Sequence, residues 1–153
     1  MPPLRIYLDT SVLGGVFDPE FEEDTAKLLE EIRSGRAFPV LSEQVEIELE
    51  PAPQKVQALL GELLGLGAEN VRLSVAADKL ADAYLNAQVV SRTYRADALH
   101  IALATLAKVD VLVSWNFKHI VNLRRIRGYN DVNLTLGYAT LEIRSPKEVL
   151  EDG

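Results

Sequence analysis

Short apolar runs that favour β-strands alternate with segments of helical spacing along almost the whole chain, and this alternation strongly limits the possible folds. The runs cover residues 4–8, 37–41, 70–73, 110–114 and 139–144. Strands separated by helices predict a parallel sheet, because each crossover returns the chain to the same edge of the sheet. Right-handed crossovers then cover both faces with helices. We therefore predict a single α/β domain over residues 1–153, with a central parallel sheet.

The composition is that of a globular protein without thiol chemistry. Hydrophobic residues make up 48% of the 153 positions, which is enough to build a core. No run approaches the roughly 20 apolar residues of a membrane helix, and the first residues lack the apolar core of a signal peptide. The sequence contains no cysteine, which excludes disulfides and thiolate metal sites. These features predict a cytoplasmic protein with no membrane partner.

The charged residues are unevenly distributed along the chain. A formal net charge of −7 argues against a nucleic-acid-binding protein, because such proteins usually present a basic surface. Residues 1–50 contain 12 acidic and 4 basic side chains, whereas residues 92–127 contain 7 basic side chains and 2 acidic ones. A basic segment can follow a nucleic-acid backbone, but a solvated helix face explains the cluster equally well. The charge pattern alone leaves both interpretations open.

The segment of residues 42–50 has two interpretations. Apolar residues alternate with glutamates along it, which is typical of a half-buried strand with every glutamate in solvent. If Ser42 instead caps a helix, Val45 and Leu49 share one face and Glu48 lies beside them. Only the helical interpretation directs Glu48 toward the apolar side, and propensity does not distinguish the two.

Four polar residues occupy positions where a polar side chain is costly or structurally unnecessary. Asp9 and Asn116 each follow an apolar run, Asp97 lies in the first turn of the very apolar segment 93–107, and Glu48 shares an apolar face if its segment is helical. Buried carboxylates near one another require a cation or protonation. Oxygen ligands suit a hard ion such as Mg²⁺ or Mn²⁺. Such a site can activate water and promote displacement at phosphorus.

Several of these residues also have a purely structural interpretation. Asp9 could be a helix N-cap, and Asp97 could be a first-turn acid that the helix dipole stabilises by about 0.3–1 kcal/mol. His100, one turn after Asp97, is better explained as a hydrogen-bonded core histidine than as a ligand. His119 lies in a polar, basic loop, where contact with phosphate and a plain surface position are equally plausible. Only the combination of acids favours a metal site.

Four short motifs follow one another in a fixed order. They are Leu-Asp-Thr-Ser at 8–11, Ser42 with Glu48 six residues later, Ala-Asp-Ala-Leu-His-Ile-Ala at 96–102 and Val-Ser-Trp-Asn-Phe-Lys-His at 113–119. Each is weak alone, but together they resemble the PIN domain family over nearly the whole chain. The resemblance implies a Rossmann-like α/β/α sandwich with a central parallel sheet. It also implies an Mg²⁺- or Mn²⁺-dependent ribonuclease, which in many prokaryotes is a VapC-type toxin inhibited by an antitoxin.

The resemblance also implies roles for individual residues. Asp9 and Asp97 would be the main metal-binding carboxylates, and Glu48 would contact the metal directly or through water. Asn116 stands where many members have a fourth acid, and an amide offers an oxygen but no charge. A second metal would therefore bind more weakly. The expected partners are an RNA substrate, a protein antitoxin and a second copy of the chain in a homodimer.

Three hypotheses for the function follow from the sequence. The leading one is a metal-dependent endoribonuclease that hydrolyses RNA phosphodiester bonds and acts as the toxin of a toxin–antitoxin pair. The alternative is a PIN-like binding module that has lost metal-dependent turnover, which Asn116 and the acidic net charge favour. The third is a nucleotide-binding α/β domain, but no glycine-rich phosphate loop follows the first apolar run.

Overall fold

A five-stranded parallel sheet forms the centre of the computed structural model, which describes residues 2–152. The strands are β1 (Leu4–Leu8), β2 (Ala37–Ser42), β3 (Glu69–Val71), β4 (Val111–Val113) and β5 (Ile143–Arg144). They lie in the order β3-β2-β1-β4-β5, and every neighbouring pair is parallel. The predicted α/β fold with a central parallel sheet is confirmed.

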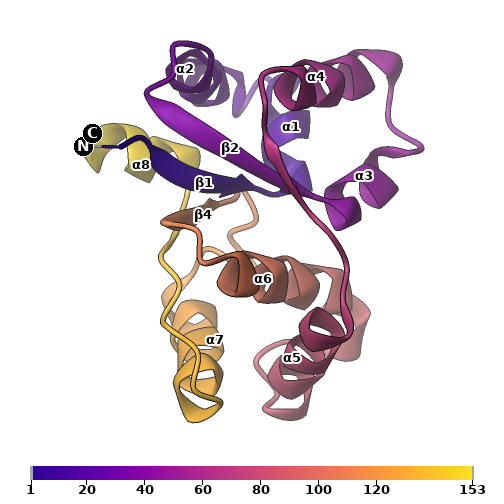
Figure 1. The fold of residues 1–153 in the computed structure, drawn as a ribbon, viewed down its shortest axis with the longest axis vertical. Coiled ribbons are helices and arrows are strands. Elements are labelled where there is room, and N and C mark those ends of the chain that lie inside the picture. Colours follow the sequence, from indigo (N-terminus) through magenta and orange to yellow (C-terminus); the bar gives the residue numbers. More distant parts are fainter. Residues whose placement is uncertain (1, 153) are drawn as a thin grey trace.

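Helices cover both faces of the sheet (Figure 1). One side holds α1 (Thr10–Gly15), α2 (Glu22–Arg33), α3 (Glu43–Leu49), α4 (Gln54–Gly65) and α8 (Pro146–Asp152). The other side holds α5 (Val75–Asn86), the 3₁₀ turn η1 (Arg92–Tyr94), α6 (Arg95–Ala107) and α7 (Leu123–Thr135). Among residues 2–152, no helix is long and apolar enough to cross a membrane.

Two hydrophobic cores lie on opposite faces of the sheet. Successive side chains of a strand point to opposite faces, so Tyr7 of β1 joins one core while Ile6 and Leu8 join the other. The core with Tyr7 packs mainly against α5, α6 and α7, and the other packs against α1 to α4. Every residue of α6 from Ala98 to Thr105 is buried. Helix α6 is therefore buried in the core on one face of the sheet, as its apolar sequence predicts.

The ambiguous segment of residues 42–50 forms helix α3 (Glu43–Leu49), with Ser42 as its N-cap, and not a strand. The Ser42 hydroxyl accepts a hydrogen bond from the backbone N–H of Val45 (3.2 Å), which satisfies one of the free N–H groups at the start of α3. Val45 and Leu49 are buried, whereas Ile47 is 47% exposed. The period-2 alternation is therefore misleading here, because tertiary packing selects only two of the three apolar residues.

The carboxyl-terminal third differs from the sequence prediction. The sequence pattern predicts a helix only over residues 122–127, but α7 continues to Thr135; β5 is limited to two residues, and α8 was not predicted. Buried polar contacts and close packing explain the length of α7. Asn133 is completely buried and donates to Thr105, and a Cβ at Gly128 would lie 2.8 Å from a methyl carbon of Val89. Because polar residues and a glycine make these contacts, the sequence shows no apolar periodicity that would predict the full length of α7.

Candidate active site

Asp9 is a buried carboxylate at the carboxyl end of the central strand β1. It is 4% exposed, and its two oxygens accept hydrogen bonds from the hydroxyls of Ser11 (2.6 Å) and Ser114 (2.5 Å). Asp9 occupies the N-cap position of α1, but its side chain makes no capping hydrogen bond. Asp9 is thus the N-cap residue by position, but its carboxylate bonds to the two serines instead of capping the helix. Burial raises the pKa of Asp9, although the charge of His100 and the two hydroxyls favour its ionised form.

The same two serines join the ends of β1 and β4. Ser11 Oγ accepts a hydrogen bond from the backbone N–H of Trp115 (2.9 Å), and Ser114 Oγ accepts one from the N–H of Asn116 (2.9 Å). Each hydroxyl thus accepts from the backbone and donates to Asp9. A hydrogen-bonded chain of this kind leaves the carboxylate little freedom to rotate. Ser11 and Ser114 therefore fix the position of Asp9.

Asp97 lies in the first turn of α6 and is partly buried. Burial, together with the negative charges of Asp9 and Glu48, raises its pKa to about 6, although His100 and Asn116 oppose this shift. Two nearby carboxylates disfavour the ionised form of a third, so they act in the same direction as burial. Asp97 is therefore not merely an acid favoured by the helix dipole, because it shares one electrostatic environment with two other carboxylates.

Glu48 projects from α3 and is held by three side chains. Its Oε1 accepts hydrogen bonds from Thr10 and from Nε2 of His100 (2.7 Å), and its Oε2 accepts one from Gln44 (3.0 Å). Burial acts to raise the pKa of Glu48, but the hydrogen bond and charge of His100, with the other two donors, leave it below the ordinary value. The helical register of α3 thus directs Glu48 inward.

His100 is the site residue that the sequence analysis did not assign to the chemistry. It is 2% exposed on α6, and it contacts Glu48 through Nε2 and the Tyr7 hydroxyl through Nδ1 (2.7 Å). Burial acts to lower its pKa, but Glu48, Asp9 and Asp97 together raise it. The prediction of a hydrogen-bonded core histidine is confirmed. Its spacing of three residues from Asp97 places both on one side of α6, and this signal could have linked it to the acids.

Asn116 follows β4 and organises the loop beyond it. Its Oδ1 accepts hydrogen bonds from the backbone N–H groups of Lys118 (3.2 Å) and His119 (2.9 Å). Its side chain also acts on Asp97, where it favours the ionised form. Asn116 therefore stands at the edge of the acidic cluster, as expected, but its amide oxygen is already used by its own turn.

The basic segment divides into paired and exposed side chains. Arg95 contacts Asp78 and Asp82, and Arg125 donates to the carbonyl of Val89 (2.7 Å). Exposed basic side chains are those of Arg92, Lys118, Arg124 and Arg127. The two bonded arginines support the structural interpretation of the cluster, whereas the four exposed residues leave positive charges in the sequence before Asp97 and after Asn116.

His119 is not a surface residue. It is 8% exposed, and its ring stacks on that of Tyr94 with centroids 3.6 Å apart. Burial, with the nearby charges of Lys118 and Arg125, lowers its pKa. Within residues 2–152, its Nδ1 is buried and has no hydrogen-bond partner. The expectation of a surface histidine in a polar loop is therefore wrong, because the loop folds back against η1.

The donor set was tested for its fit to a divalent cation. Among residues 2–152, no group of three or more His, Asp or Glu side chains is arranged closely enough to hold a metal ion. Burial nevertheless raises the pKa of both Asp9 and Asp97, and the charge of Asp9 adds to the shift at Asp97. A hard divalent ion would offset this unfavourable burial of charge, and carboxylate oxygens are the ligands it prefers. The residue types therefore fit Mg²⁺ or Mn²⁺.

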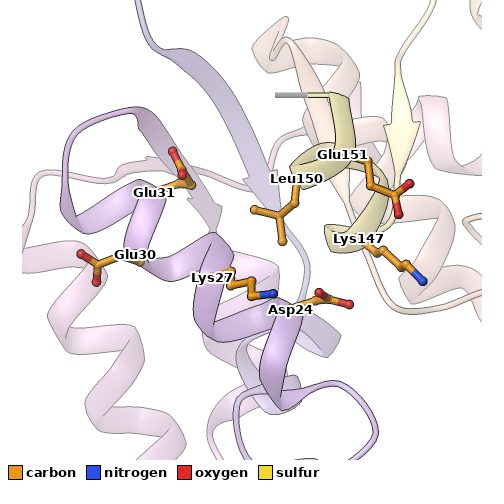
Figure 2. Close-up of a pocket in the computed structure, with 7 residues that line it drawn as sticks. All are labelled: Asp24, Lys27, Glu30, Glu31, Lys147, Leu150 and Glu151. Atoms are coloured by element: carbon orange, nitrogen blue, oxygen red, sulfur yellow. The ribbon is translucent and has the colours of Figure 1, made fainter.

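The acidic cluster is separate from a hollow between α2 and α8 (Figure 2). The hollow has a volume of about 560 Å³ and is lined by Asp24, Lys27, Glu30, Glu31, Lys147, Leu150 and Glu151. None of the candidate site residues contributes to it. Its lining mixes both signs of charge on exposed helices, so it lacks the convergent, buried carboxylates of the site at the carboxyl ends of β1 and β4.

Comparison with known proteins shows the fold and no more. No protein-family model and no curated protein sequence matches the chain. Among solved structures, a chain of VapBC2 from Rickettsia felis, bound to a DNA fragment from its promoter, is similar, with a TM-score of 0.58 and 14% sequence identity. The match covers 93% of this chain and 98% of that chain. The two chains therefore share an α/β architecture over almost their whole lengths, with little sequence in common.

Proposed function

We propose that the protein is a metal-dependent endoribonuclease of the PIN type and the toxin of a toxin–antitoxin pair. The observation that carries the proposal is the contact of Glu48 with His100, one turn after Asp97 on α6, while burial and the charges of Asp9 and Glu48 raise the pKa of Asp97 to about 6. These acids project from β1, α3 and α6 at the carboxyl edge of a parallel sheet, where α/β proteins bind ligands. Clustered, partly buried acids in such a position are candidates for catalysis.

The similarity to VapBC2 supports the biological part of this proposal. That complex was determined with promoter DNA. If this chain corresponds to a VapC-type toxin, its partner is a protein antitoxin, and a homodimer is the expected assembly. Because 14% identity shows the fold alone, the antitoxin, the dimer and the RNA substrate are all parts of the proposal.

In this proposal each acid has a distinct role. Asp9 and Asp97 would hold Mg²⁺ or Mn²⁺, and Glu48, whose Oε1 already accepts two hydrogen bonds, would assist directly or through water. A bound ion supplies Lewis acidity and lowers the pKa of water. Ser11 and Ser114 keep the Asp9 carboxylate in place.

The exposed basic side chains would contact the substrate outside this cluster. Lys118 and Arg124 are exposed in and beyond the loop that Asn116 organises, and Phe117 beside them is 50% exposed. Cations attract the phosphate backbone, and an exposed aromatic ring can stack on an unpaired base. Single-stranded RNA therefore suits this surface.

The direct test is cleavage of RNA in the presence of Mn²⁺ by the wild type and by Asp9→Asn and Asp97→Asn. Each substitution keeps the side-chain volume and removes one charge, so we expect each to slow cleavage by at least about 100-fold. EDTA should abolish the wild-type activity. Equal rates for the three proteins would refute the proposal.

A non-catalytic binding module is the second candidate. The Asn116 oxygen is used by two backbone N–H groups, and Glu48 is paired with His100, so the site has fewer free donors than its residue count suggests. Calorimetric titration with Mn²⁺ separates the two functions. A folded protein that binds no Mn²⁺ and cleaves no RNA would support the binding module.

A further inference from the structure

We propose that His100 is a positioning residue, which, backed by Tyr7 and Ser42, fixes the carboxylate of Glu48 in the candidate active site. This inference rests on the proposed function, because it assigns a role in that same site. It concerns a residue outside the expected set of acids.

His100 is the rigid member of the group that holds Glu48. Thr10 and Gln44 are partly exposed, whereas His100 is 2% exposed on a helix that is buried along most of its length. A glutamate side chain has several rotatable bonds and loses considerable rotamer freedom when it is ordered. A donor on a buried, immobile ring is therefore the contact best suited to select one position of the Glu48 carboxylate.

His100 is itself fixed from behind by two completely buried side chains. The Tyr7 hydroxyl lies 2.7 Å from Nδ1 of His100 and 2.7 Å from Oγ of Ser42, and both residues are 0% exposed. Ser42 is in turn the N-cap of α3, the helix that carries Glu48. The chain of contacts therefore connects β1, the end of β2 and α6, and it returns to α3. The helix and the carboxylate on it are set by one network.

The network ends on a group with remaining capacity to bind. An ionised carboxylate has about four acceptor positions, and Thr10, His100 and Gln44 use three of them. One position on Oε2 is left for a further donor, such as a water molecule. Because the carboxylate can only accept, Nε2 of His100 is the donor whichever way the Tyr7 contact runs. His100 thus orients the last acceptor position.

Two substitutions, each of which keeps a hydrogen-bonding group at the position of one ring nitrogen, test this role. In His100→Gln the side-chain amide can place an N–H where Nε2 stands, toward Glu48, whereas in His100→Asn it reaches only the position of Nδ1, toward Tyr7. We expect His100→Asn to weaken Mn²⁺ binding about 10- to 100-fold, as loss of a group that orients a ligand does, and His100→Gln to stay closer to the wild type. Calorimetry measures both affinities. The control is Tyr84→Phe, which removes a buried hydroxyl that donates to Asn133 (2.5 Å) and contacts none of the site residues.

A second measurement works without metal. The imidazole N–H of His100 should give a slowly exchanging proton resonance in the metal-free wild type, because it is buried and hydrogen-bonded. We expect this resonance to shift in Glu48→Gln and in Tyr7→Phe and to stay unchanged in Tyr84→Phe. If the chemical shift of this resonance changes in neither Glu48→Gln nor Tyr7→Phe, the positioning role is refuted. Equal Mn²⁺ affinities of the two His100 variants would refute it as well. Failure of the wild type to bind Mn²⁺, with the resonance behaving as expected, would refute only the metal-dependent function.

Discussion

Two buried polar networks, one on each side of α6, differ in what they connect. In the first, the Tyr84 hydroxyl donates to Asn133 (2.5 Å), and Asn133 donates to Thr105 (3.2 Å). All members are neutral, and the chain joins α5, α7 and α6 inside the core. In the second, Tyr7 and His100 lead to Glu48, which is ionisable and 24% exposed. The first network ends in the core, whereas the second ends at the surface on a charge.

Electrostatic coupling between members distinguishes a functional polar network from a structural one. Both satisfy buried groups that would otherwise cost about 1–3 kcal/mol each. Only the second contains groups that shift each other's pKa, namely Glu48 and His100, and both also act on the pKa of the neighbouring Asp97. Mutual electrostatic coupling beside an accessible carboxylate is a feature of functional sites, so removal of a charge there should lower activity without lowering stability.

The largest expected difference concerns the charge of Asp9. Asp9→Asn should reduce RNA cleavage by at least about 100-fold, yet in EDTA its melting temperature at pH 7 should equal or exceed that of the wild type, because an amide is less costly to bury than a carboxylate. Asn133→Ala should behave in the opposite way, with lower stability and normal cleavage. Melting followed by circular dichroism, beside a cleavage assay, checks both. A strongly destabilised Asp9→Asn would contradict the distinction.

The next largest effect is expected when the tyrosine hydroxyl is removed from each network. Tyr7→Phe and Tyr84→Phe each remove one buried hydroxyl and leave its partner without that hydrogen bond, so each should lower the free energy of unfolding by about 1–3 kcal/mol. Only Tyr7→Phe should also slow cleavage, by about 10-fold, because it loosens His100. Urea denaturation and initial cleavage rates measure the two quantities. Slower cleavage by Tyr84→Phe would remove the contrast between the networks.

Stability should depend on pH through Asp97. Its pKa is raised from 3.8 to about 6 in the folded state, so the folded protein binds the proton more tightly than the unfolded chain does. The stabilising contribution is complete below about pH 4 and is lost as the pH rises to about 6. After allowance for solvent screening, the loss is on the order of 1–2 kcal/mol. Denaturation in EDTA at several pH values should show this decline in the wild type. A matching decline in Asp97→Asn would assign it to other groups.

The smallest effect is expected from Asn116→Asp. The carboxylate can still accept from the N–H groups of Lys118 and His119, so the loop should be retained. The added charge should raise the pKa of Asp97 further and should strengthen binding of a second Mn²⁺ ion by a few-fold. Calorimetric stoichiometry and a pH titration of stability check this. Unchanged stoichiometry and an unchanged pH profile would show that residue 116 lies outside the acidic cluster.

The architecture, and the acids that we propose for the site, could be predicted from the sequence alone. Alternating apolar runs and helical segments predicted the parallel sheet, and they did so because strand and helix periodicities are local properties of the chain. The positions of Asp9 and Asp97, after a strand and at the start of an apolar helix, followed from the same local reasoning. The single domain and the metal remain predictions.

Which side chains contact one another became clear only from the tertiary structure. It selected the helix over the strand for residues 42–50, because the interior accepts Val45 and Leu49 but leaves Ile47 exposed. It also extended α7, and it brought His100 against Glu48, which lies 52 residues earlier. Long-range contacts of this kind depend on packing across the whole sheet, and no local pattern records them. The acids were therefore predictable one by one, whereas the histidine that links them was visible only in the folded chain.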